Sequence, residues 1–405
     1  MNTAQGSVAP VQILAISDVY PPDLGEVAVS LRTLLREIQA KGHAVTLIAP
    51  ECGANDDDRC DDVIRVSAHA VRLRARVARV MKVQRVLELT ERLRGWNYDL
   101  VHVHTPGVAY IAGTALARRL RLPVVATCYA LQEEALLRSF PVLRPAGART
   151  VARLLARVYC RGLDGLVVRS YTLRERLETY GFPGPIAVAP AAVEVQLLQC
   201  GDGARFRAAH GISEERAVLL HAGDLADAAE TDFLLAVLRR VREDMGDVML
   251  VLAGEGVVPT PLRARVEALG LREHVLFASP IGRLDDMLDG YRAADCFVAA
   301  PRREKRNLRL LEALAAGLPA VTTRAAARCH ALEEGGGVIM AADDVPHFAG
   351  QVRGVLTDPR IHAELSAEGM RQSQQWSASL AAEQVLDCYR QVLRERRSMA
   401  RALAQ

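Results

Sequence analysis

The stretch VQILAISDVYPPDLGEVAVSLRTLLREIQAKGHAVTLIA, residues 11–49, decides the fold. An apolar run at 11–17 is followed by an amphipathic stretch at 27–41, which Gly42 ends, and by a second apolar run at 44–49. This succession predicts a strand, a helix and a second strand. Strands that are joined through a helix run parallel, in a sheet that helices cover on both faces. The sequence therefore predicts a parallel α/β sheet.

The same rhythm continues along the chain and then starts again near residue 216. Further strands are expected at 100–104, 123–127 and 165–169, and a second series at 217–222, 248–253, 275–277, 296–299 and 320–323. Helices are expected between them, including 230–243, 261–269, 283–294 and 308–316, and a long C-terminal helix at 377–397. Two doubly wound, Rossmann-like domains follow, joined near residues 190–206. We expect them to face each other across a cleft at the carboxyl ends of their strands.

Composition excludes several classes of protein. The chain has 405 residues, of which 50% are apolar, 24% charged and 4% aromatic, and its net charge is only +3. These values are typical of a soluble globular protein and give no bulk attraction to nucleic acid. No apolar run approaches the roughly 18 residues of a membrane helix, and the first residues lack a basic signal region. We therefore expect a cytoplasmic chain.

A metal site is not expected. The eight cysteines form no C-x-x-C pair, so a structural zinc site is not indicated. His102 and His104 lie one residue apart on a predicted strand and share a face, but no third ligand accompanies them. The D-x-D at 56–58 falls in the Asp-rich stretch 55–62, which is expected to be a solvated loop, so no divalent ion on a diphosphate is indicated.

Residues 304–319 read EKRNLRLLEALAAGLP and carry the strongest local signal. Glu304 lies before the predicted helix and Glu312 just over one turn into it. Carboxylates accept hydrogen bonds from vicinal hydroxyl groups, and the free N–H groups at a helix start bind phosphate. The pattern fits a sugar-nucleotide site. Taken alone, it also fits a helix whose start is merely stabilised by acidic charge.

Four further motifs favour the first interpretation: SDVYPPDLG at 17–25, VHVHTP at 101–106, GEG at 254–256 and YRAADCFV at 291–298. Together with residues 304–319 they resemble glycosyltransferase family 4, over about residues 12–375. The resemblance implies a GT-B fold, with domains at 1–198 and 199–375 and a final helix, 376–405, that returns to the first domain. It also implies sugar transfer, with retention, from a nucleoside diphosphate sugar of the UDP or GDP type. The N-terminal half is most similar to the branch that glycosylates membrane lipids.

The resemblance implies roles for matching residues. Glu312 would hold the ribose hydroxyls, Glu304 would face the donor sugar, and the turn at 279–281 would lie against the base. Residues 307–309 would offer backbone N–H groups to phosphate. The expected catalytic residues are Glu304 and Tyr129, and His104 is expected on the acceptor side. The expected donor-binding residues are Gly25, Gly223, Gly254, Ile281, Lys305, Arg306, Asn307, Leu308, Arg309 and Glu312. No cofactor or metal is implied beyond the donor itself.

Several positions depart from the family pattern. The family's phosphate-binding Arg and Lys are replaced by Asp224 and Ala229, a glycine by Glu26, and a histidine by Tyr129. The family's P-T-G-x-D turn reads PAAVE at 190–194, without its glycine. The basic residues at 302, 303, 305 and 306 would provide a relocated phosphate grip, or they form a solvated loop.

Two interpretations of function therefore stay open. The first is an enzyme that acts on a lipid-linked or saccharide acceptor in envelope glycolipid or polysaccharide synthesis. The second is a degenerate relative that serves as a partner subunit or a sugar-binding module. A dehydrogenase is disfavoured, because the first strand–helix turn lacks G-x-G-x-x-G.

Two basic stretches suggest contact with a membrane surface. Arginines recur at 149, 153, 157 and 161, and basic residues at 72, 74, 76, 79, 82 and 85. Both stretches were expected to form amphipathic helices with cationic faces, which suit an anionic bilayer. Solvated helix faces explain them equally. Low aromatic content and the absence of a recognition motif argue against nucleic acid as a partner.

Overall fold

The computed structural model describes most of the chain. The described residues are 9–20, 26–51, 62–73, 76–128, 154, 157, 159–189, 192–254, 258–278, 284–301, 307–329, 332 and 336–403. The chain divides into two compact units. Unit 1 comprises Met1–Ala192 and Ala378–Gln405, and unit 2 comprises Val193–Ser377.

Unit 1 is built on a seven-stranded sheet in the order β3-β2-β1-β6-β7-β8-β9, in which every described pair of neighbours is parallel. Its strands are β1 (Gln12–Ile16), β2 (Ala44–Pro50), β3 (Val63–Val66), β6 (Leu100–Val103), β7 (Val124–Cys128), β8 (Gly165–Val168) and β9 (Ile186–Val188). The central strands β6 and β8 are buried along their whole length, because helices cover both faces of the sheet.

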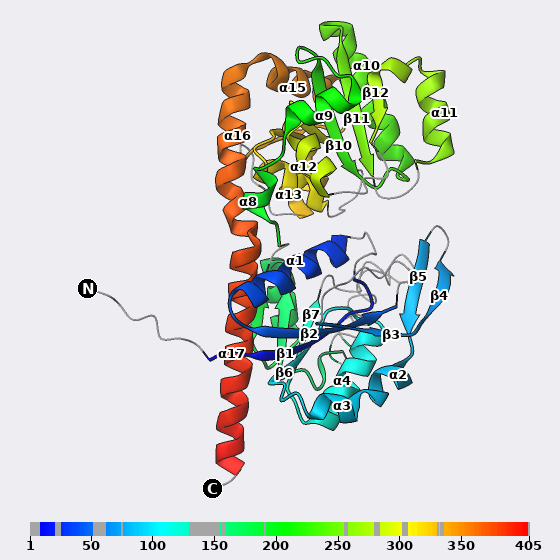
Figure 1. Cartoon of the computed structure of the whole chain (residues 1–405). Helices are drawn as coiled ribbons and strands as arrows, with labels where there is room; N and C mark the ends of the chain where they lie inside the picture. Colours follow the sequence, from blue (N-terminus) through cyan, green and yellow to red (C-terminus); the bar gives the residue numbers. More distant parts are fainter. Residues whose placement is uncertain are drawn as a thin grey trace, which may run out of the picture. The chain divides into compact units, whose positions relative to one another are not determined.

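The helices of unit 1 form two layers (Figure 1). They are α1 (Glu26–Ala40), α2 (Val83–Glu88), α3 (Thr90–Arg94), α4 (Val108–Leu120), α7 (Tyr171–Thr179) and α17 (Ala378–Leu403). α1 and α17 share one hydrophobic core with one face of the sheet, and α4 packs in the core of the other face. Gly42, at a φ of 85°, ends α1 as expected. The last helix of the chain thus completes the core of unit 1.

Unit 2 repeats the architecture with a six-stranded parallel sheet in the order β12-β11-β10-β13-β14-β15. Its strands are β10 (Ala217–Gly223), β11 (Val248–Gly254), β12 (Val275–Phe277), β13 (Cys296–Ala299), β14 (Ala320–Thr323) and β15 (Val338–Ala341). Its helices are α8 (Val195–Leu198), α9 (Gly203–His210), α10 (Ala228–Met245), α11 (Thr260–Ala268), α12 (Leu284–Ala293), α13 (Leu308–Ala315), α14 (Arg324–Cys329), α15 (Val345–Thr357) and α16 (Pro359–Ser373), with short 3₁₀ turns η1 (Arg272–His274) and η2 (Gln374–Trp376).

Each sheet has one point where the strand order reverses. In unit 1 the chain builds outward from β1 through β2 to β3, and then returns to β6 on the other side of β1. In unit 2 the corresponding neighbours are β10 and β13. At such a switch point the flanking connections diverge and leave a crevice at the carboxyl ends of the two strands, where ligands bind in open α/β sheets. The two doubly wound sheets confirm the predicted fold class.

One predicted element is wrong. The basic stretch from 72 to 85 is not one amphipathic helix: β4 (Ala68–Leu73) and β5 (Arg76–Met81) form an antiparallel hairpin, and only α2 after them is helical. Arginines at 72, 74 and 76 alternate with apolar residues, which is the pattern of a strand, whereas the basic residues at 76, 79, 82 and 85 recur at the spacing of a helix. Of the other basic stretch, residues 154, 157, 159 and 160 are helical, and 149 and 153 lie outside the described residues. Among the helices that the structure describes, none is long and apolar enough to cross a bilayer.

Candidate functional site

The crevice of unit 2 lies where β10 and β13 separate. The two strands pair at Leu219 with Cys296 and at Leu220 with Phe297. Beyond these pairs, side chains bridge the gap. His221 Nδ1 lies 3.0 Å from the carbonyl oxygen of Val298. The carboxylate of Glu230, in the first turn of α10, accepts a hydrogen bond from the N–H of Ala300, 2.9 Å away. The strand ends are therefore held apart by polar groups rather than by a sheet ladder.

His221 leaves an unsatisfied nitrogen in this crevice. A carbonyl oxygen only accepts, so Nδ1 carries the hydrogen and donates it to Val298. Nε2 has no partner among the described residues, although the side chain is 1% exposed. A Cβ on Gly223 would lie 3.6 Å from Nε2 and 3.6 Å from Asn307 Nδ2. The missing side chain of Gly223 thus leaves room beside two polar groups, and a buried unpaired polar atom of this kind is typical of a ligand site.

Asn307 connects the start of α13 to the end of β10. Its side-chain oxygen accepts a hydrogen bond from the N–H of Arg309 (3.0 Å), so Asn307 is the N-cap, and its Nδ2 donates to the carbonyl oxygen of Ala222 (3.1 Å). In this structure the cap already uses the Arg309 N–H, and the offer of this group to a phosphate stays a prediction.

Glu312 is held by two donors on the buried side of α13. The hydroxyl of Tyr291 donates to Glu312 Oε2 at 2.7 Å, and Arg309 forms an ion pair with the same oxygen at 2.8 Å. Burial, followed by the charge of Glu312, raises the pKa of Tyr291 well above its usual range, so the phenol keeps its proton and donates. The Glu312 side chain is 11% exposed. The carboxylate is thus oriented by its neighbours, as a group that binds hydroxyls must be.

The structure brings part of the predicted donor site together. Gly223, Asn307, Leu308, Arg309 and Glu312 lie on β10 and α13, on either side of the crevice. Gly254 ends the neighbouring strand β11. A Cβ there would lie 2.6 Å from the side chain of Leu225, so only glycine fits. The predicted site residues Gly25, Tyr129, Ile281, Glu304, Lys305 and Arg306 lie outside the described residues.

An anion and a neutral residue, Asp224 and Ala229, stand where the family pattern has two cations. Asp224 follows β10 directly, and its Oδ1 accepts a hydrogen bond from the N–H of Ala226 at 3.1 Å. Ala229 is exposed in the first turn of α10. Glu230, next to it, was not singled out from the sequence, because its role depends on a contact with Ala300, 70 residues away. Tyr291 and His221 were missed for the same reason, although Tyr291 opens the quoted motif YRAADCFV.

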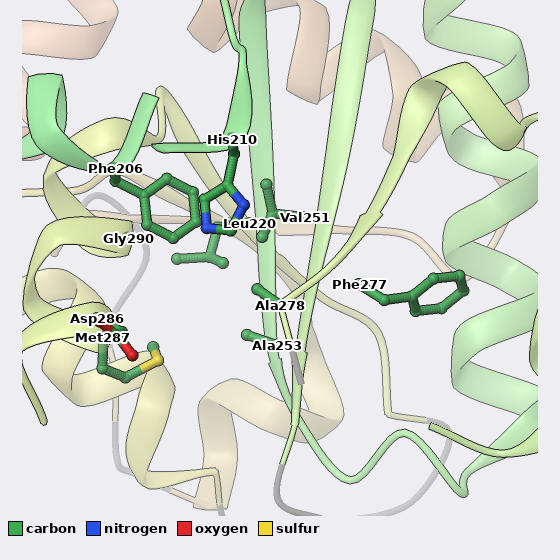
Figure 2. Close-up of a pocket in the computed structure, with 10 residues that line it drawn as sticks. All are labelled: Phe206, His210, Leu220, Val251, Ala253, Phe277, Ala278, Asp286, Met287 and Gly290. Carbon is green, nitrogen blue, oxygen red and sulfur yellow. The ribbon is translucent and has the colours of Figure 1, made fainter. Parts of the chain in front are cut away.

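A cavity of about 240 Å³ opens along the same sheet beside the crevice (Figure 2). Its walls are mostly apolar and come from α9, α12 and the strands β10 to β12. Ala253 and Ala278 mark its end at the carboxyl ends of the strands. The rings of Phe206 and His210 lie together in its wall, with centroids 4.5 Å apart. The lining residues are Phe206, His210, Leu220, Val251, Ala253, Phe277, Ala278, Asp286, Met287 and Gly290.

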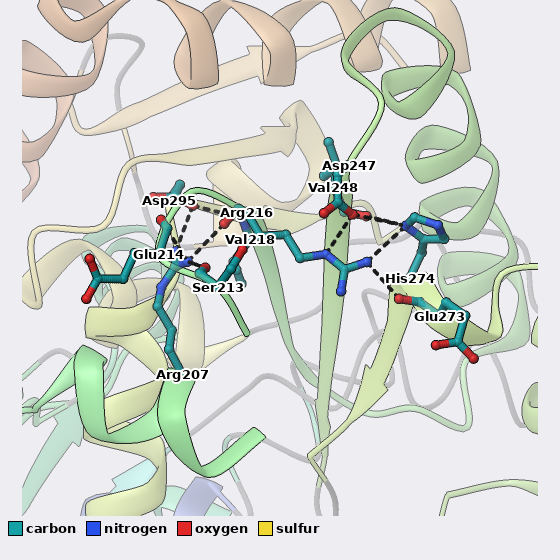
Figure 3. A network of polar contacts seen from close by, with 10 residues as sticks. All are labelled: Arg207, Ser213, Glu214, Arg216, Val218, Asp247, Val248, Glu273, His274 and Asp295. Atoms are coloured by element: carbon teal, nitrogen blue, oxygen red, sulfur yellow. Dashed lines mark hydrogen bonds and ion pairs between the residues drawn. The ribbon is translucent and has the colours of Figure 1, made fainter. Parts of the chain in front are cut away.

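The amino edge of the unit 2 sheet has a different character (Figure 3). Arg207 pairs with Asp295 (3.1 Å) and donates to the carbonyl oxygens of Ser213 and Arg216. Arg216 in turn pairs with Asp247 at 2.9 Å. Charges at this edge neutralise one another and tie the strand starts together. The carboxyl edge, with its unpaired His221 nitrogen, is therefore the better candidate for ligand binding.

Unit 1 has polar groups at its own switch point. The Asp18 carboxylate, just after β1, accepts hydrogen bonds from Thr105 Oγ1 (2.7 Å) and from the N–H of Ala109 (2.9 Å) at the start of α4. Burial raises the pKa of this carboxyl group. The start of α4 is thus occupied by the Asp18 carboxylate of the chain itself. His104 follows β6 and is buried beside His102, with ring centroids 3.8 Å apart. Among the described residues no three His, Cys, Asp or Glu side chains gather to hold a metal ion.

Comparison with known proteins places these features in context. The sequence profile described as Glycosyltransferase Family 4 matches residues 27–197, and that described as Glycosyl transferases group 1 matches 202–372. The alpha-monoglucosyldiacylglycerol synthase of Streptococcus pneumoniae is 25% identical over 77% of this chain and 70% of its own. A D-inositol 3-phosphate glycosyltransferase of Acidothermus cellulolyticus is 30% identical over 76% and 70%. Among solved structures, HepE of Anabaena in complex with UDP and glucose is similar with a TM-score of 0.69, at 16% identity over 93% of this chain and 98% of HepE.

Proposed function

Since this chain belongs to glycosyltransferase family 4 and has the GT-B fold, it is a nucleotide-sugar-dependent glycosyltransferase, and we propose that it transfers the sugar with retention to a lipid-linked or saccharide acceptor of the cell envelope. The observation that carries the proposal is the oriented Glu312, which lies in α13 just over one turn after the helix begins, next to the unit 2 crevice. Its two donors, Tyr291 and Arg309, fix the carboxylate so that an oxygen can accept from ribose hydroxyls.

The donor would lie across the switch point of unit 2. Its diphosphate would occupy the room beside Gly223, near Asn307 and the start of α13, where the helix dipole favours negative charge. The base would lie toward the ends of β11 and β12, which line the apolar cavity, and Ile281 is proposed to contact it. UDP and GDP both satisfy this geometry. HepE, a neighbour in fold, binds UDP.

The reaction breaks the bond between the anomeric carbon and the diphosphate oxygen. The acceptor oxygen bonds to the same face of that carbon, and its proton passes to an oxygen of the departing diphosphate. Such a step needs stabilised negative charge on the leaving group. Lys305 and Arg306 would provide it beside Glu304, which would face the donor sugar. Tyr129 would donate a hydrogen bond to that sugar, because a phenol is a poor base at neutral pH.

The acceptor side is proposed from the relatives and from unit 1. One relative is named for a diacylglycerol product and another for D-inositol 3-phosphate, so lipids and polyol phosphates are the first acceptors to test. Peripheral contact with an anionic membrane is part of the proposal. In the described part of the basic stretch at 149–161, Leu154 is 63% exposed and Arg157 is also exposed. An exposed apolar residue beside an exposed arginine suits a bilayer surface.

Calorimetric titration with UDP and with GDP tests the donor site. We expect micromolar binding of one nucleotide by the wild-type chain and its loss in Glu312→Ala. Transfer is then measured from radiolabelled UDP- and GDP-sugars to vesicles that contain diacylglycerol or phosphatidylinositol, and to D-inositol 3-phosphate. Product NMR reports the anomeric configuration, and inversion would refute retention.

A second function is favoured by Asp224 and Ala229, which replace two cations at the crevice. If a folded chain binds neither nucleotide, the proposed transfer is wrong. The chain would then serve as a non-catalytic partner subunit or sugar-binding module, and a search for a protein partner would replace the search for a substrate.

A further inference from the structure

Four buried side chains of unit 1 form a hydrogen-bonded row, which we call the histidine chain: Tyr389, His102, Thr127 and His104. The hydroxyl of Tyr389 lies 2.5 Å from His102 Nδ1, and His102 Nε2 lies 2.8 Å from Thr127 Oγ1. Thr127 Oγ1 lies 3.4 Å from His104 Nδ1, which is the longest link. The four side chains are at most 3% exposed. The row therefore runs from the C-terminal helix α17, across β6 and β7, to the strand ends.

The row ends at the switch point of unit 1. His104 directly follows β6, and its backbone N–H donates to the carbonyl oxygen of Ile16 at the end of β1 (2.9 Å). Its Nε2 is buried and has no partner within the described part of the chain. This nitrogen is thus an unpaired polar atom at the place in the sheet where a ligand is expected.

The polarity of the row follows from counting partners. In one polarity Tyr389 donates to His102, His102 Nε2–H donates to Thr127, and the Thr127 hydroxyl donates to His104 Nδ1. His104 then carries its hydrogen on Nε2, the one group left without a partner. In the reverse polarity the Tyr389 hydroxyl hydrogen also lacks an acceptor among the described residues. Because each buried unsatisfied group is costly, the first polarity is favoured.

Both imidazoles stay neutral, so each ring has one donor nitrogen and one acceptor nitrogen, as this direction of the hydrogen bonds requires. Burial, aided by Arg169, lowers the pKa of His102 to about 3. Burial, His102 and Arg169 together lower the pKa of His104 well below its usual range. Burial raises the pKa of Tyr389 well above its usual range, so the phenol keeps its proton. In this polarity His104 cannot act as a general base at neutral pH, because the hydrogen already occupies Nε2.

We propose that Tyr389, through His102 and Thr127, fixes His104 as a neutral Nε2–H donor to an oxygen of the acceptor substrate. The inference rests on the proposed function, in which unit 1 holds the acceptor. Tyr389, His102 and Thr127 are then positioning residues. The recognised group is an oxygen with a free lone pair, such as a hydroxyl that is about to attack. A cation or an N–H donor would be rejected, because two donors would face each other.

Nitrogen-15 NMR of protein labelled at its ten histidines tests the tautomers without any substrate. Signals are assigned with His102→Gln and His104→Gln. We expect Nε2–H and a bare Nδ1 for both residues in the wild type. In Tyr389→Phe both polarities leave the same number of groups unsatisfied, so a measurable fraction of His104 should change to Nδ1–H. Tyr98→Phe, which changes a buried tyrosine just before the amino end of β6, is the matched control and should leave the tautomers unchanged.

A wild-type His104 with its hydrogen on Nδ1 would overturn the proposal, as would an unchanged tautomer in folded Tyr389→Phe. If Tyr389→Phe does not fold, Thr127→Val interrupts the same row and takes its place. Once an acceptor has been found, Tyr389→Phe should raise its KM about three- to tenfold, which is the effect of one neutral hydrogen bond, and leave UDP or GDP titration unchanged. Tautomers as expected without any transfer would refute the proposed function but not the row. Transfer with an unchanged acceptor KM would refute the role of His104.

Discussion

Restoring the two missing cations should strengthen nucleotide binding. Asp224→Arg and Ala229→Lys together place two basic side chains beside Gly223, at the end of β10 and in the first turn of α10. Each charge-assisted hydrogen bond to a diphosphate contributes about 1.5–3 kcal/mol. Ordering each long side chain costs up to about 2 kcal/mol. The two contacts together contribute about 3–6 kcal/mol and the ordering costs up to about 4 kcal/mol. Since replacing Asp224 also removes a repulsion, we expect a net gain of about 1.5–3 kcal/mol, which is about a 10- to 100-fold gain in affinity.

The assay is calorimetric titration of the double variant with UDP and GDP at physiological salt. The matched control carries Glu215→Arg and Ala209→Lys, two exposed positions that precede β10 at the opposite edge of the sheet. Its change in net charge is the same. A gain confined to the crevice variant supports the site. Equal gains in affinity in both variants would show that the added net charge, and not the position of the two residues, strengthens binding. No gain in the crevice variant would show that the diphosphate lies elsewhere. Loss of the Asp224 turn bond should cost about 1 kcal/mol of stability, which thermal unfolding reports.

Three further outcomes follow from described contacts. Tyr291→Phe removes a hydrogen-bond donor from Glu312. We expect a free energy of unfolding lower by about 1–2 kcal/mol in denaturant and several-fold weaker nucleotide binding. Undiminished binding would show that the Tyr291 hydroxyl does not contribute to the nucleotide site. His102 and His104 have pKa values lowered in the folded state, to about 3 for His102, so their contribution is fully present above pH 6.5 and falls as the unfolded chain takes up protons. For His102 this amounts to about 1.4 kcal/mol per pH unit, so its share of the free energy of unfolding should fall by about 2–3 kcal/mol between pH 7 and pH 4.5. His104 adds to the loss in the same direction, so His104→Gln should make the free energy of unfolding less dependent on pH, and an unchanged dependence would contradict this. Gly201→Ala would bring a Cβ within 2.2 Å of a backbone carbonyl oxygen in α12, and a melting temperature within 2 °C of wild type would contradict the expected loss of about 2 kcal/mol or more.

The sequence was sufficient for most of the fold, because buried parallel strands leave continuous apolar runs. Three strands were not predicted: β3, which is mostly half-buried, β9, which has only three residues, and β15, whose apolar run has only four residues. The hairpin β4–β5 was predicted as a helix because the basic residues at 76, 79, 82 and 85 recur at a helical spacing. Local patterns therefore predicted the covered core of each sheet and failed at the edge strands β3, β9 and β15, whereas the edge strand β12 was predicted.

The candidate site was predictable only where a motif is contiguous. Glu312 and Asn307 follow from residues 304–319. His221 and Glu230 contact Val298 of β13 and Ala300 just after it, 77 and 70 residues away in the sequence. Local residue spacing does not predict contacts over such distances. Tyr389 is 287 residues from His102, so its hydroxyl could be recognised only after the final helix was placed in unit 1.

The return of α17 to unit 1 also determines the order in which the two units can be completed during synthesis. The buried side of this helix, which includes Ala382, Val385 and Val392, belongs to the same core as β1 and α1. A ribosome that has finished residue 192 must still make all of unit 2 before it reaches Ala378, which takes about 10–40 s at ~5–20 residues per second. During that interval one face of the first sheet is covered by α1 but lacks α17, and the apolar side chains that α17 would bury are available to chaperones or to other nascent chains. The unit that is synthesised first is thus the last to close, and a stop codon shortly before residue 378 would remove part of the N-terminal core rather than a dispensable tail.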